Sequence, residues 1–233
     1  MRISKRSHKK ELIDLGDDHY TKEEYQDCLN QLDRINRFLG GDRATYRSFD
    51  LIKTPPLSIL DVGCGGGLFT LKLAKRYPFA KVIGIDISRD AIEIAKANLH
   101  NTSLPPSNVE FHVPSSPELA YPEKSFDIIT STLVCHHLDD DQLISFLKNG
   151  VSIARKAVII NDLHRHPLAT CGYALAAPLF FRNRLVIHDG FLSIKRGFTR
   201  KDWMAYLSAA GIPAEKVQIH WNWAFRWTVT IHV

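Results

Sequence analysis

Short apolar runs alternate with segments of helical periodicity through most of the chain, and this alternation limits the fold more than any other feature. Helical segments such as residues 68–76 and 139–153 follow several of these runs. Repeated strand–helix units build a parallel sheet with helices on both of its faces. We therefore predict a doubly wound α/β sheet. The runs with the length and composition of buried strands are residues 57–62, 81–85, 109–113, 126–131, 157–160 and 217–221.

The segment before this repeat contains one clear helix. Thr21 and Glu24 form a capping box, and the pair that starts at Gly40 is a stop signal. Between them, apolar side chains recur at helical spacing, which predicts an amphipathic helix over residues 22–39. Residues 42–56 end in two prolines and are expected to be a connector.

These observations predict the organisation of the chain. Residues 1–56 are expected to be an N-terminal extension with a basic tip and a helix, and residues 57–233 the main domain. Residues 163–197 are an unusually long connection, which we interpret as a lid insertion over a site. Residues 225–233 alternate apolar and polar side chains and predict a last, antiparallel strand whose two faces have different surroundings.

The net charge of +5 and the pI near 9.0 first suggest a nucleic-acid partner. The charge is concentrated in five basic side chains of the first ten residues, and no acidic residue offsets them there. The rest of the chain sums to zero, which argues against a surface that follows phosphates. We expect a solvated tail, with at most a weak contact to a membrane surface. The basic residues are Arg2, Lys5, Arg6, Lys9 and Lys10.

The cysteines indicate the compartment. Cys28, Cys64, Cys135 and Cys171 lie far apart and form no pair at metal-binding or redox spacing. No apolar segment follows the basic tip as it would in a secretory signal. The apolar stretch 167–181 is too short to span a bilayer. We expect a cytoplasmic protein with reduced cysteines.

A glycine-rich turn follows the first predicted strand, with Asp61 at the strand end and glycines at positions 63, 65, 66 and 67. Glycines at such a turn let the backbone approach a ligand closely. The dinucleotide-binding pattern needs a small third residue, and Leu68 stands there when the pattern starts at Gly63. A pyrophosphate ligand therefore fits this turn poorly.

The turn instead resembles the first motif of class I S-adenosylmethionine-dependent methyltransferases, an acidic residue followed by G-x-G-x-G. Asp86 ends the second strand 19 residues after Gly67, where a carboxylate can bind both ribose hydroxyls. The F-D-I-I sequence from Phe126 and the H-H-L sequence from His136 resemble a segment of small-molecule methyltransferases, including the ubiquinone- and menaquinone-biosynthesis group. The resemblance implies a Rossmann-like sheet.

The resemblance also implies S-adenosylmethionine as the cofactor. This molecule carries an ammonium and a sulfonium group, which suit an anion at the strand end. The family's usual adenine contact, an aspartate, falls on Ser115 here, which leaves adenine to a hydroxyl and to the backbone near Ser116. The residues that the resemblance assigns to the cofactor are Asp61, Gly63, Cys64, Gly65, Gly67, Asp86, Ile87, Ser115, Ser116 and Thr132.

Methyl transfer requires alignment of the nucleophile and, for a hydroxyl acceptor, a base. His136 and His137 follow the fourth strand, and His188 stands beside Asp189 in the lid. Each histidine is a candidate base. His136 and His137 could instead cap or pack beneath the next helix, and residues 188–190 could form a turn. The substrate contacts that we expect are Asp162, Arg165, Tyr173 and Asp189.

Residues 168–181 are strongly apolar and predict a helix in the lid, which either packs over the sheet or forms a wall for a lipophilic acceptor. Asn161 and Asp162 resemble a metal-ligand pair of catechol-type O-methyltransferases. Thr132 stands where those enzymes have a further carboxylate, so we expect no metal.

These patterns predict transfer of a methyl group from S-adenosylmethionine to a small aromatic or lipophilic acceptor, such as a phenol, a quinol or a polyketide. One alternative is a nucleic-acid methyltransferase, but the chain lacks the Asn/Asp-Pro-Pro-aromatic and Pro-Cys motifs of those enzymes. A second alternative is a non-catalytic partner protein that binds the cofactor. The sequence leaves open the acceptor, oxygen versus carbon methylation, and the oligomeric state.

Overall fold

The structure, a computed structural model, describes residues 5–116 and 119–233. The strands of this part of the chain are β1 (Ser58–Val62), β2 (Lys81–Ile85), β3 (Val109–His112), β4 (Phe126–Thr132), β5 (Ala154–Leu163), β6 (Val217–Asn222) and β7 (Arg226–His232). They form a seven-stranded sheet in the order β3-β2-β1-β4-β5-β7-β6. β7 is antiparallel to β5 and β6, and the other neighbouring pairs are parallel. The mostly parallel sheet with an antiparallel last strand is confirmed.

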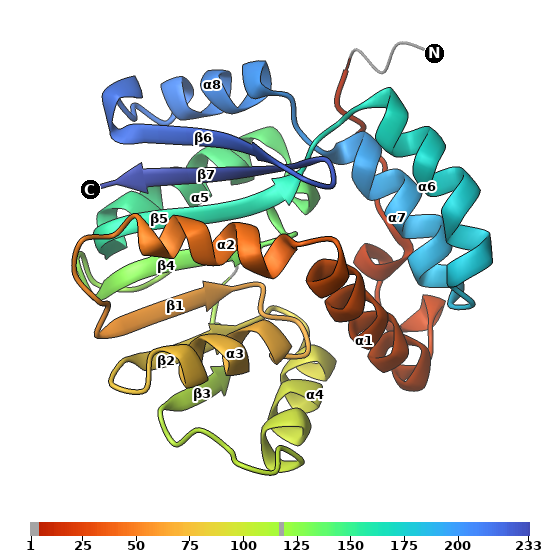
Figure 1. The fold of residues 1–233 in the computed structure, drawn as a ribbon, viewed down its shortest axis with the longest axis horizontal. Helices are drawn as coiled ribbons and strands as arrows, with labels where there is room; N and C mark the ends of the chain where they lie inside the picture. The colour runs from red at the N-terminus through yellow and green to blue at the C-terminus, as the bar shows by residue number, and fades with distance from the viewer. Residues whose placement is uncertain (1–4, 117–118) are drawn as a thin grey trace.

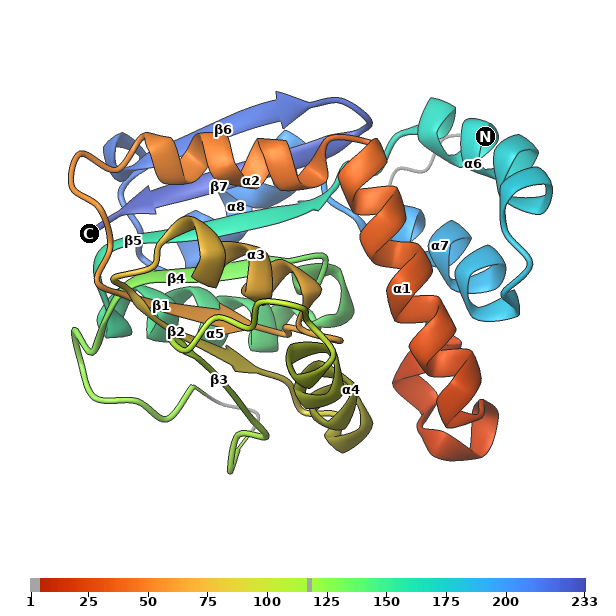
Figure 2. The same cartoon turned by 60° about the horizontal axis from the view of Figure 1, so that its bottom comes forward.

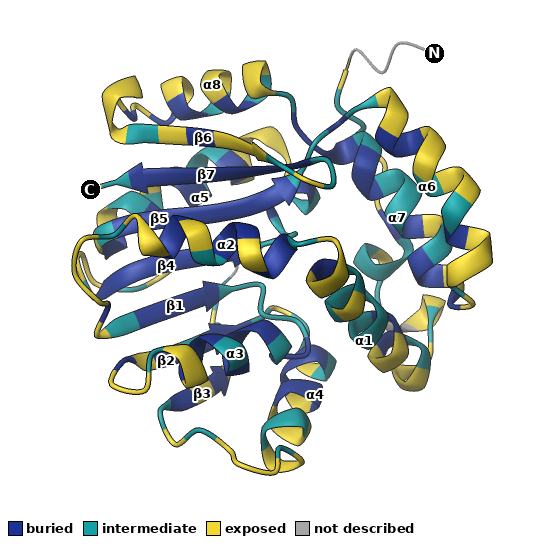
Figure 3. Cartoon of the chain, viewed as in Figure 1, coloured by how far each residue is buried: buried dark blue, intermediate teal, exposed yellow. Residues whose placement is uncertain are grey.

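The helices are α1 (Lys22–Phe38), α2 (Gly41–Asp50), α3 (Leu68–Arg76), α4 (Arg89–His100), α5 (Asp140–Ile153), α6 (Pro167–Phe180), α7 (Arg184–Arg196) and α8 (Arg200–Ala209), with four 3-10 turns: η1 (Leu12–Leu15), η2 (Asp17–His19), η3 (Cys135–His137) and η4 (Ala214–Lys216). Apolar residues of α2, α3 and α4 pack on one face of the sheet, and those of α5 and α8 on the other. Two apolar cores result, and the strands β4, β5 and β7 between them are almost wholly buried (Figure 3). The doubly wound arrangement is therefore confirmed.

The expected connector at residues 42–56 is wrong, because α2 occupies most of it. Gly40 adopts a left-handed conformation with φ of 75°, which ends α1 and starts α2 at once. α2 packs against β5 and β7, with Phe49 buried in the core. The Asn161 side chain donates hydrogen bonds to the Gly41 carbonyl at 2.9 Å and to the Thr45 hydroxyl at 2.8 Å. The stop signal was real, but a second helix follows it directly.

The last strand has two buried faces of different chemistry. Trp227, Val229 and Ile231 join the apolar core on the face that α5 and α8 cover. Arg226 and Thr228 alternate with them and are buried as well. The predicted difference between the two faces is therefore present, as an apolar face and a polar face inside the protein.

The lid insertion forms two helices, α6 and α7. In Figure 1 the arrowheads of β1 and β5 point toward α1, α6 and α7, while β7 runs the other way. The lid therefore lies at the carboxyl ends of the parallel strands, and Figure 2 shows α7 between α6 and α1. Among the described residues, no helix is both long and apolar enough to cross a bilayer.

The expectation of a solvated basic tail is wrong for Arg6. Its guanidinium donates hydrogen bonds to the His136 carbonyl at 3.0 Å and the Arg196 carbonyl at 2.9 Å. It also lies over the Phe198 ring, 4.7 Å from the ring centroid. The N-terminal segment is thereby attached to η3 and to the end of α7. Lys9 and Lys10 are exposed, as expected, and Arg2 lies outside the described residues.

Gly67→Ala should destabilise the fold more than Gly211→Ala. Both glycines have a left-handed backbone, with φ of 72° and 73°, so the backbone strain of about 1 kcal/mol is common to both variants. A methyl group at Gly67 would lie 2.7 Å from the Phe111 ring, whereas nothing lies within 4 Å of one at Gly211. We expect about 1–3 kcal/mol of additional loss at Gly67 in urea unfolding. Equal losses would contradict this packing.

Arg6→Ala should lower the free energy of unfolding by about 2–4 kcal/mol, because several charge-assisted hydrogen bonds are lost. Lys10→Ala removes the same charge from the same segment, but Lys10 is exposed and the loss should stay within about 0.5 kcal/mol. Urea unfolding of the two variants measures the difference. If both substitutions were neutral, the segment would not be attached as described.

Candidate functional site

The turn between β1 and α3 presents closely packed backbone at the carboxyl end of β1. The Gly63 and Cys64 amides donate to the Ile85 carbonyl of β2, at 2.8 and 3.0 Å. Gly63 has φ of 72°, and a Cβ there would lie 2.3 Å from Val134. On the open side, Leu29 of α1 lies 3.3 Å from the position of a Cβ at Gly65. The turn therefore forms a cradle that α1 covers.

Two buried carboxylates stand at the ends of the neighbouring strands β1 and β2. Asp61 accepts a hydrogen bond from the Thr70 hydroxyl at 2.6 Å, and burial raises the pKa of Asp61 to about 7. Asp86 accepts from the Gly65 and Ser88 amides, both at 2.9 Å, and burial raises the pKa of Asp86 as well. The negative charge of Asp86 adds to the rise in the pKa of Asp61. A cradle with two such groups fits a ligand that carries ammonium, sulfonium and ribose hydroxyl groups.

The other predicted cofactor residues surround this cradle. Ile87 follows Asp86 and leaves 74% of its surface exposed, so its side chain is free to pack against a flat ring. Ser115 is exposed and Ser116 is half-buried after the end of β3. Cys64 lies within the turn, and Thr132 ends β4. All of them lie at or beyond the carboxyl ends of strands, as the prediction requires.

A cluster of histidines and carboxylates lies at the ends of β4 and β5. His136 is 2% exposed, its Nδ1 lies 2.7 Å from Asp162, and its amide donates to the same carboxylate at 3.1 Å. His137 is half-buried, and its Nδ1 lies 2.7 Å from Asp14. Burial alone would raise the pKa of both aspartates, but contact with the histidines lowers the pKa of Asp162, and lowers that of Asp14 to about 2.

Glu11 faces both histidines. Its carboxylate oxygens lie 3.6 Å from Nε2 of His136 and 3.9 Å from Nε2 of His137. Glu11 is 2% exposed, and burial raises the pKa of Glu11 to about 7. Ser193 of α7 donates a hydrogen bond to it at 2.8 Å. We define the carboxylate–histidine cluster as Glu11, Asp14, His136, His137 and Asp162.

Arg196, at the end of α7, holds this cluster together. Its guanidinium donates to the His136 carbonyl at 2.8 Å, the His137 carbonyl at 2.7 Å and the Asp14 carboxylate at 2.7 Å. Sequence reasoning missed Glu11, Asp14 and Arg196. The acidic residues directly after the basic tip, and the arginine at the end of the lid, were the available signals, and neither indicated a partner more than a hundred residues away.

The lid residues that we predicted do not join the cluster. His188 lies on α7, with its side chain 58% exposed and its Nδ1 2.8 Å from Asp189. The Asp189 carboxylate accepts the Leu12 and Ile13 amides, at 2.9 and 3.1 Å, and so fixes the N-terminal segment. The alternative of a turn at residues 188–190 is wrong, because they lie within a helix.

Tyr173 and Arg165 have structural partners. The Tyr173 hydroxyl donates to the Val186 carbonyl and so joins α6 to α7. Arg165 is 4% exposed, donates to the Gly197 carbonyl at 2.7 Å and pairs with Asp202 at 3.0 Å. The Arg165 guanidinium therefore joins the base of the lid to α8, and its expected contact with a substrate stays a prediction.

The cradle and the carboxylate–histidine cluster are adjacent. They lie at the ends of strands that are neighbours in the sheet, β2-β1-β4-β5. The charge of His137 lowers the pKa of Asp86, although burial dominates that group, so the two sites share an electrostatic environment. His137 is the member of the histidine pair that keeps an exposed part, with 26% of its side chain accessible. A ligand in the cradle would thus extend toward a group that can bind and release protons.

Comparison with known proteins gives a family for this region. Residues 59–156 match the family described as a methyltransferase domain. Malonyl-[acyl-carrier protein] O-methyltransferase 1 of Ilyobacter polytropus is 33% identical over 127 residues, which are 52% of this chain and 41% of that protein. Ubiquinone biosynthesis O-methyltransferase of Pelagibacter ubique is 32% identical over 100 residues, which are 43% of this chain and 38% of that protein.

A solved structure supports the fold. The S-adenosylmethionine-dependent methyltransferase of Aquifex aeolicus superposes with a TM-score of 0.67, over 92% of this chain and 99% of that one, at 17% identity. The matched segments span about two fifths of the length of the curated relatives. Residues 59–156, which match the family, contain the glycine-rich cradle, Asp86 and the end of β4. Residues 59–156 of the chain therefore match a methyltransferase domain, and the fold of the chain is similar to that of an S-adenosylmethionine-dependent methyltransferase.

Proposed function

We propose that this protein transfers the methyl group of S-adenosylmethionine to an oxygen of a small lipophilic acceptor. The observation that carries the proposal is the carboxylate–histidine cluster beside the cofactor cradle. A cofactor cradle alone would equally suit a binding protein, whereas a buried cluster that exchanges protons beside it suits a chemical step.

The cradle residues have distinct roles in this proposal. Asp86 accepts hydrogen bonds from the ribose hydroxyls, and Asp61 attracts the ammonium group of the methionine part. Ile87 covers one face of the adenine, and Ser115 or the backbone near Ser116 contacts its edge. α1 closes over the bound cofactor, because Leu29 already lies against the cradle. S-adenosylmethionine supplies the methyl group on its sulfonium.

The cluster would act on the acceptor. A lone pair of the acceptor oxygen forms the new bond to the methyl carbon while the carbon–sulfur bond breaks in line with it. The proton of the acceptor hydroxyl passes to the group formed by Glu11 and His137, and His136 remains buried behind them. Asp14 and Asp162 orient the two rings through Nδ1. Two relatives are named as O-methyltransferases, one of malonyl-[acyl-carrier protein] and one of ubiquinone biosynthesis, and these names support oxygen as the acceptor atom.

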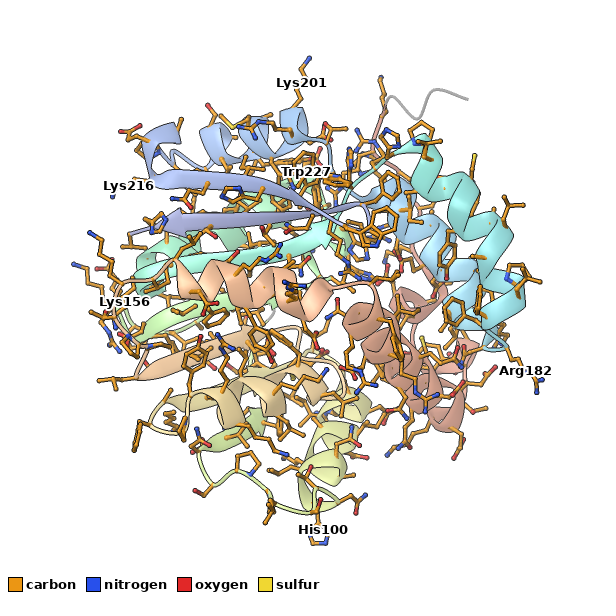
Figure 4. All side chains as sticks on the ribbon, in the orientation of Figure 1. His100, Lys156, Arg182, Lys201, Lys216 and Trp227 are labelled. Carbon is orange, nitrogen blue, oxygen red and sulfur yellow. The ribbon has the colours of Figure 1, made fainter. Side chains whose placement is uncertain are left out.

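The lid supports a lipophilic acceptor. α6 carries no charged residue, and its Leu175, Leu179 and Phe180 leave 75%, 81% and 76% of their surface exposed. Arg182 follows α6 and points outward in Figure 4. An exposed apolar face with a neighbouring cation can rest weakly on an anionic membrane, where a lipophilic acceptor is dissolved.

Cofactor affinity should rise with pH because the pKa of Asp61 is about 7. Below that value the carboxyl is neutral and does not attract the ammonium group, so affinity should increase about tenfold from about pH 5.5 to about pH 7.5. Calorimetry with S-adenosylmethionine measures this. Asp61→Asn should remove the pH dependence of cofactor affinity. Asp86→Asn should weaken cofactor binding by about tenfold or more, and the affinity should still rise with pH. If Asp86→Asn bound normally, our assignment of the cradle would be wrong.

Methyl transfer to a phenol with a long alkyl tail, followed by mass spectrometry, tests the reaction. His137→Gln should lower kcat by about 10²–10⁴ without loss of cofactor binding. His188→Gln is the matched control, because His188 also has a carboxylate at its Nδ1 but lies outside the cluster, and it should keep normal turnover. The reverse result would place the reaction at the lid. No product with any phenol or carboxylic acid, despite cofactor binding, would favour a non-catalytic protein.

A further inference from the structure

Three side chains of the carboxylate–histidine cluster are arranged as metal ligands are. One ligand atom each from Glu11, His136 and His137 lies within 4.8 Å of the other two. The separations from Glu11 to the two Nε2 atoms are 3.6 and 3.9 Å. A tetrahedral ion with bonds of about 2.0–2.1 Å holds its ligand atoms about 3.4 Å apart. Both separations from Glu11, which involve its two different oxygens, are therefore within about 0.5 Å of the spacing around a bound ion, and the third separation is at most 4.8 Å.

The proton positions on the histidines also suit a metal. Nδ1 of His136 lies 2.7 Å from the Asp162 carboxylate, and Nδ1 of His137 lies 2.7 Å from the Asp14 carboxylate. A ring N–H at Nδ1 satisfies each of these contacts and leaves the lone pair at Nε2, which faces Glu11 in both histidines. A carboxylate behind Nδ1 with a metal at Nε2 is the usual arrangement of histidine ligands.

Glu11 is a buried acid with an incomplete set of partners. Among the described residues, no hydrogen bond reaches its Oε1, although the side chain is 2% exposed and this oxygen is directed at Nε2 of His136. A buried carboxylate oxygen without a donor is costly. The cluster holds three carboxylates, and the guanidinium of Arg196 lies 3.8 Å from Glu11 and 2.7 Å from Asp14. A divalent cation would satisfy the oxygen and offset the excess negative charge.

We infer that Glu11, His136 and His137 form a binding site for one divalent transition-metal ion, and that Zn²⁺ is the ion that fits it best. Two imidazole nitrogens and one carboxylate are a ligand set of zinc enzymes, and three protein ligands leave a position open. Mg²⁺ prefers a shell of oxygen atoms and suits this site poorly. The site differs from the catechol-type arrangement, because neither Asn161 nor Thr132 contributes to it.

The open position gives the ion a role in the proposed function. If that function holds, an acceptor hydroxyl at the open position would release its proton more readily, and to water, because Glu11 and His137 would then be ligands of the ion and not proton acceptors. The binding site itself rests only on the geometry of the three side chains. It can therefore be tested without cofactor or acceptor.

Calorimetry of the full chain, free of any affinity tag and stripped with EDTA, should show one equivalent of Zn²⁺ bound per chain, with a higher unfolding temperature. Mg²⁺ at the same concentration should not bind there.

Glu11→Gln and His137→Gln should each weaken Zn²⁺ binding by about 100-fold, because each variant removes one of the three ligands. His137 is half-buried, so its variant is expected to fold even if Glu11→Gln does not, and circular dichroism checks both. His100→Gln, at the exposed end of α4 in Figure 4, is the control and should bind normally.

Co²⁺ in place of Zn²⁺ adds a spectroscopic measure, because its visible absorption reports nitrogen and oxygen ligation and should disappear in His137→Gln. The inference would be overturned if the wild-type protein bound no stoichiometric Zn²⁺. It would also be overturned if the Glu11→Gln variant bound Zn²⁺ as tightly as the wild type. Methyl transfer that proceeds fully after removal of all metal would remove the ion's role and leave the proposed function intact. Zn²⁺ binding without methyl transfer to any acceptor would support the metal site and contradict the proposed function.

Discussion

Arg196 makes the interaction on which the candidate site depends. Its guanidinium is 5% exposed and donates to three main-chain carbonyls, those of Lys9, His136 and His137, and to the Asp14 carboxylate. These acceptors belong to the N-terminal segment and to the turn after β4, and Arg196 itself ends the lid. Removal of one member of a buried charged network typically costs about 3–5 kcal/mol, because the remaining charges lose their partners. The histidine pair is therefore fixed from outside the sheet.

The sheet supplies the other half of the site. β1, β2, β4 and β5 are parallel, so their carboxyl ends lie on one side of the sheet, where α1, α6 and α7 gather (Figure 1). The strand order changes direction between β1 and β4, which places the ligand crevice there. Asp61 and Asp86 stand at two of these ends, and the histidine pair follows the third. The two parts of the site are therefore positioned in different ways. Strand ends position the cradle, and long-range ion pairs position the carboxylate–histidine cluster.

Much of the cofactor side was predictable from the sequence. Asp61, the glycines after it and Asp86 are placed by local patterns on adjacent strands, and parallel strands necessarily bring their ends together. The capping boxes at Thr21 and Thr199 were also predictable, because they involve residues three positions apart. The helix α2 was not, because a Gly-Gly stop signal and a run of polar residues hid a face that the sheet buries.

The sequence by itself determined the α/β sheet, its antiparallel last strand and the cradle, because these depend on periodicity and on spacing within a few residues. Only the tertiary structure decided that Arg6 binds the turn after β4 and the end of α7, that Glu11 faces His136 and His137, and that His188 lies apart from them. Those contacts join residues 60 to 190 positions apart, and burial changes both their charge state and their partners. A local sequence pattern does not indicate which distant charged group a buried carboxylate will contact.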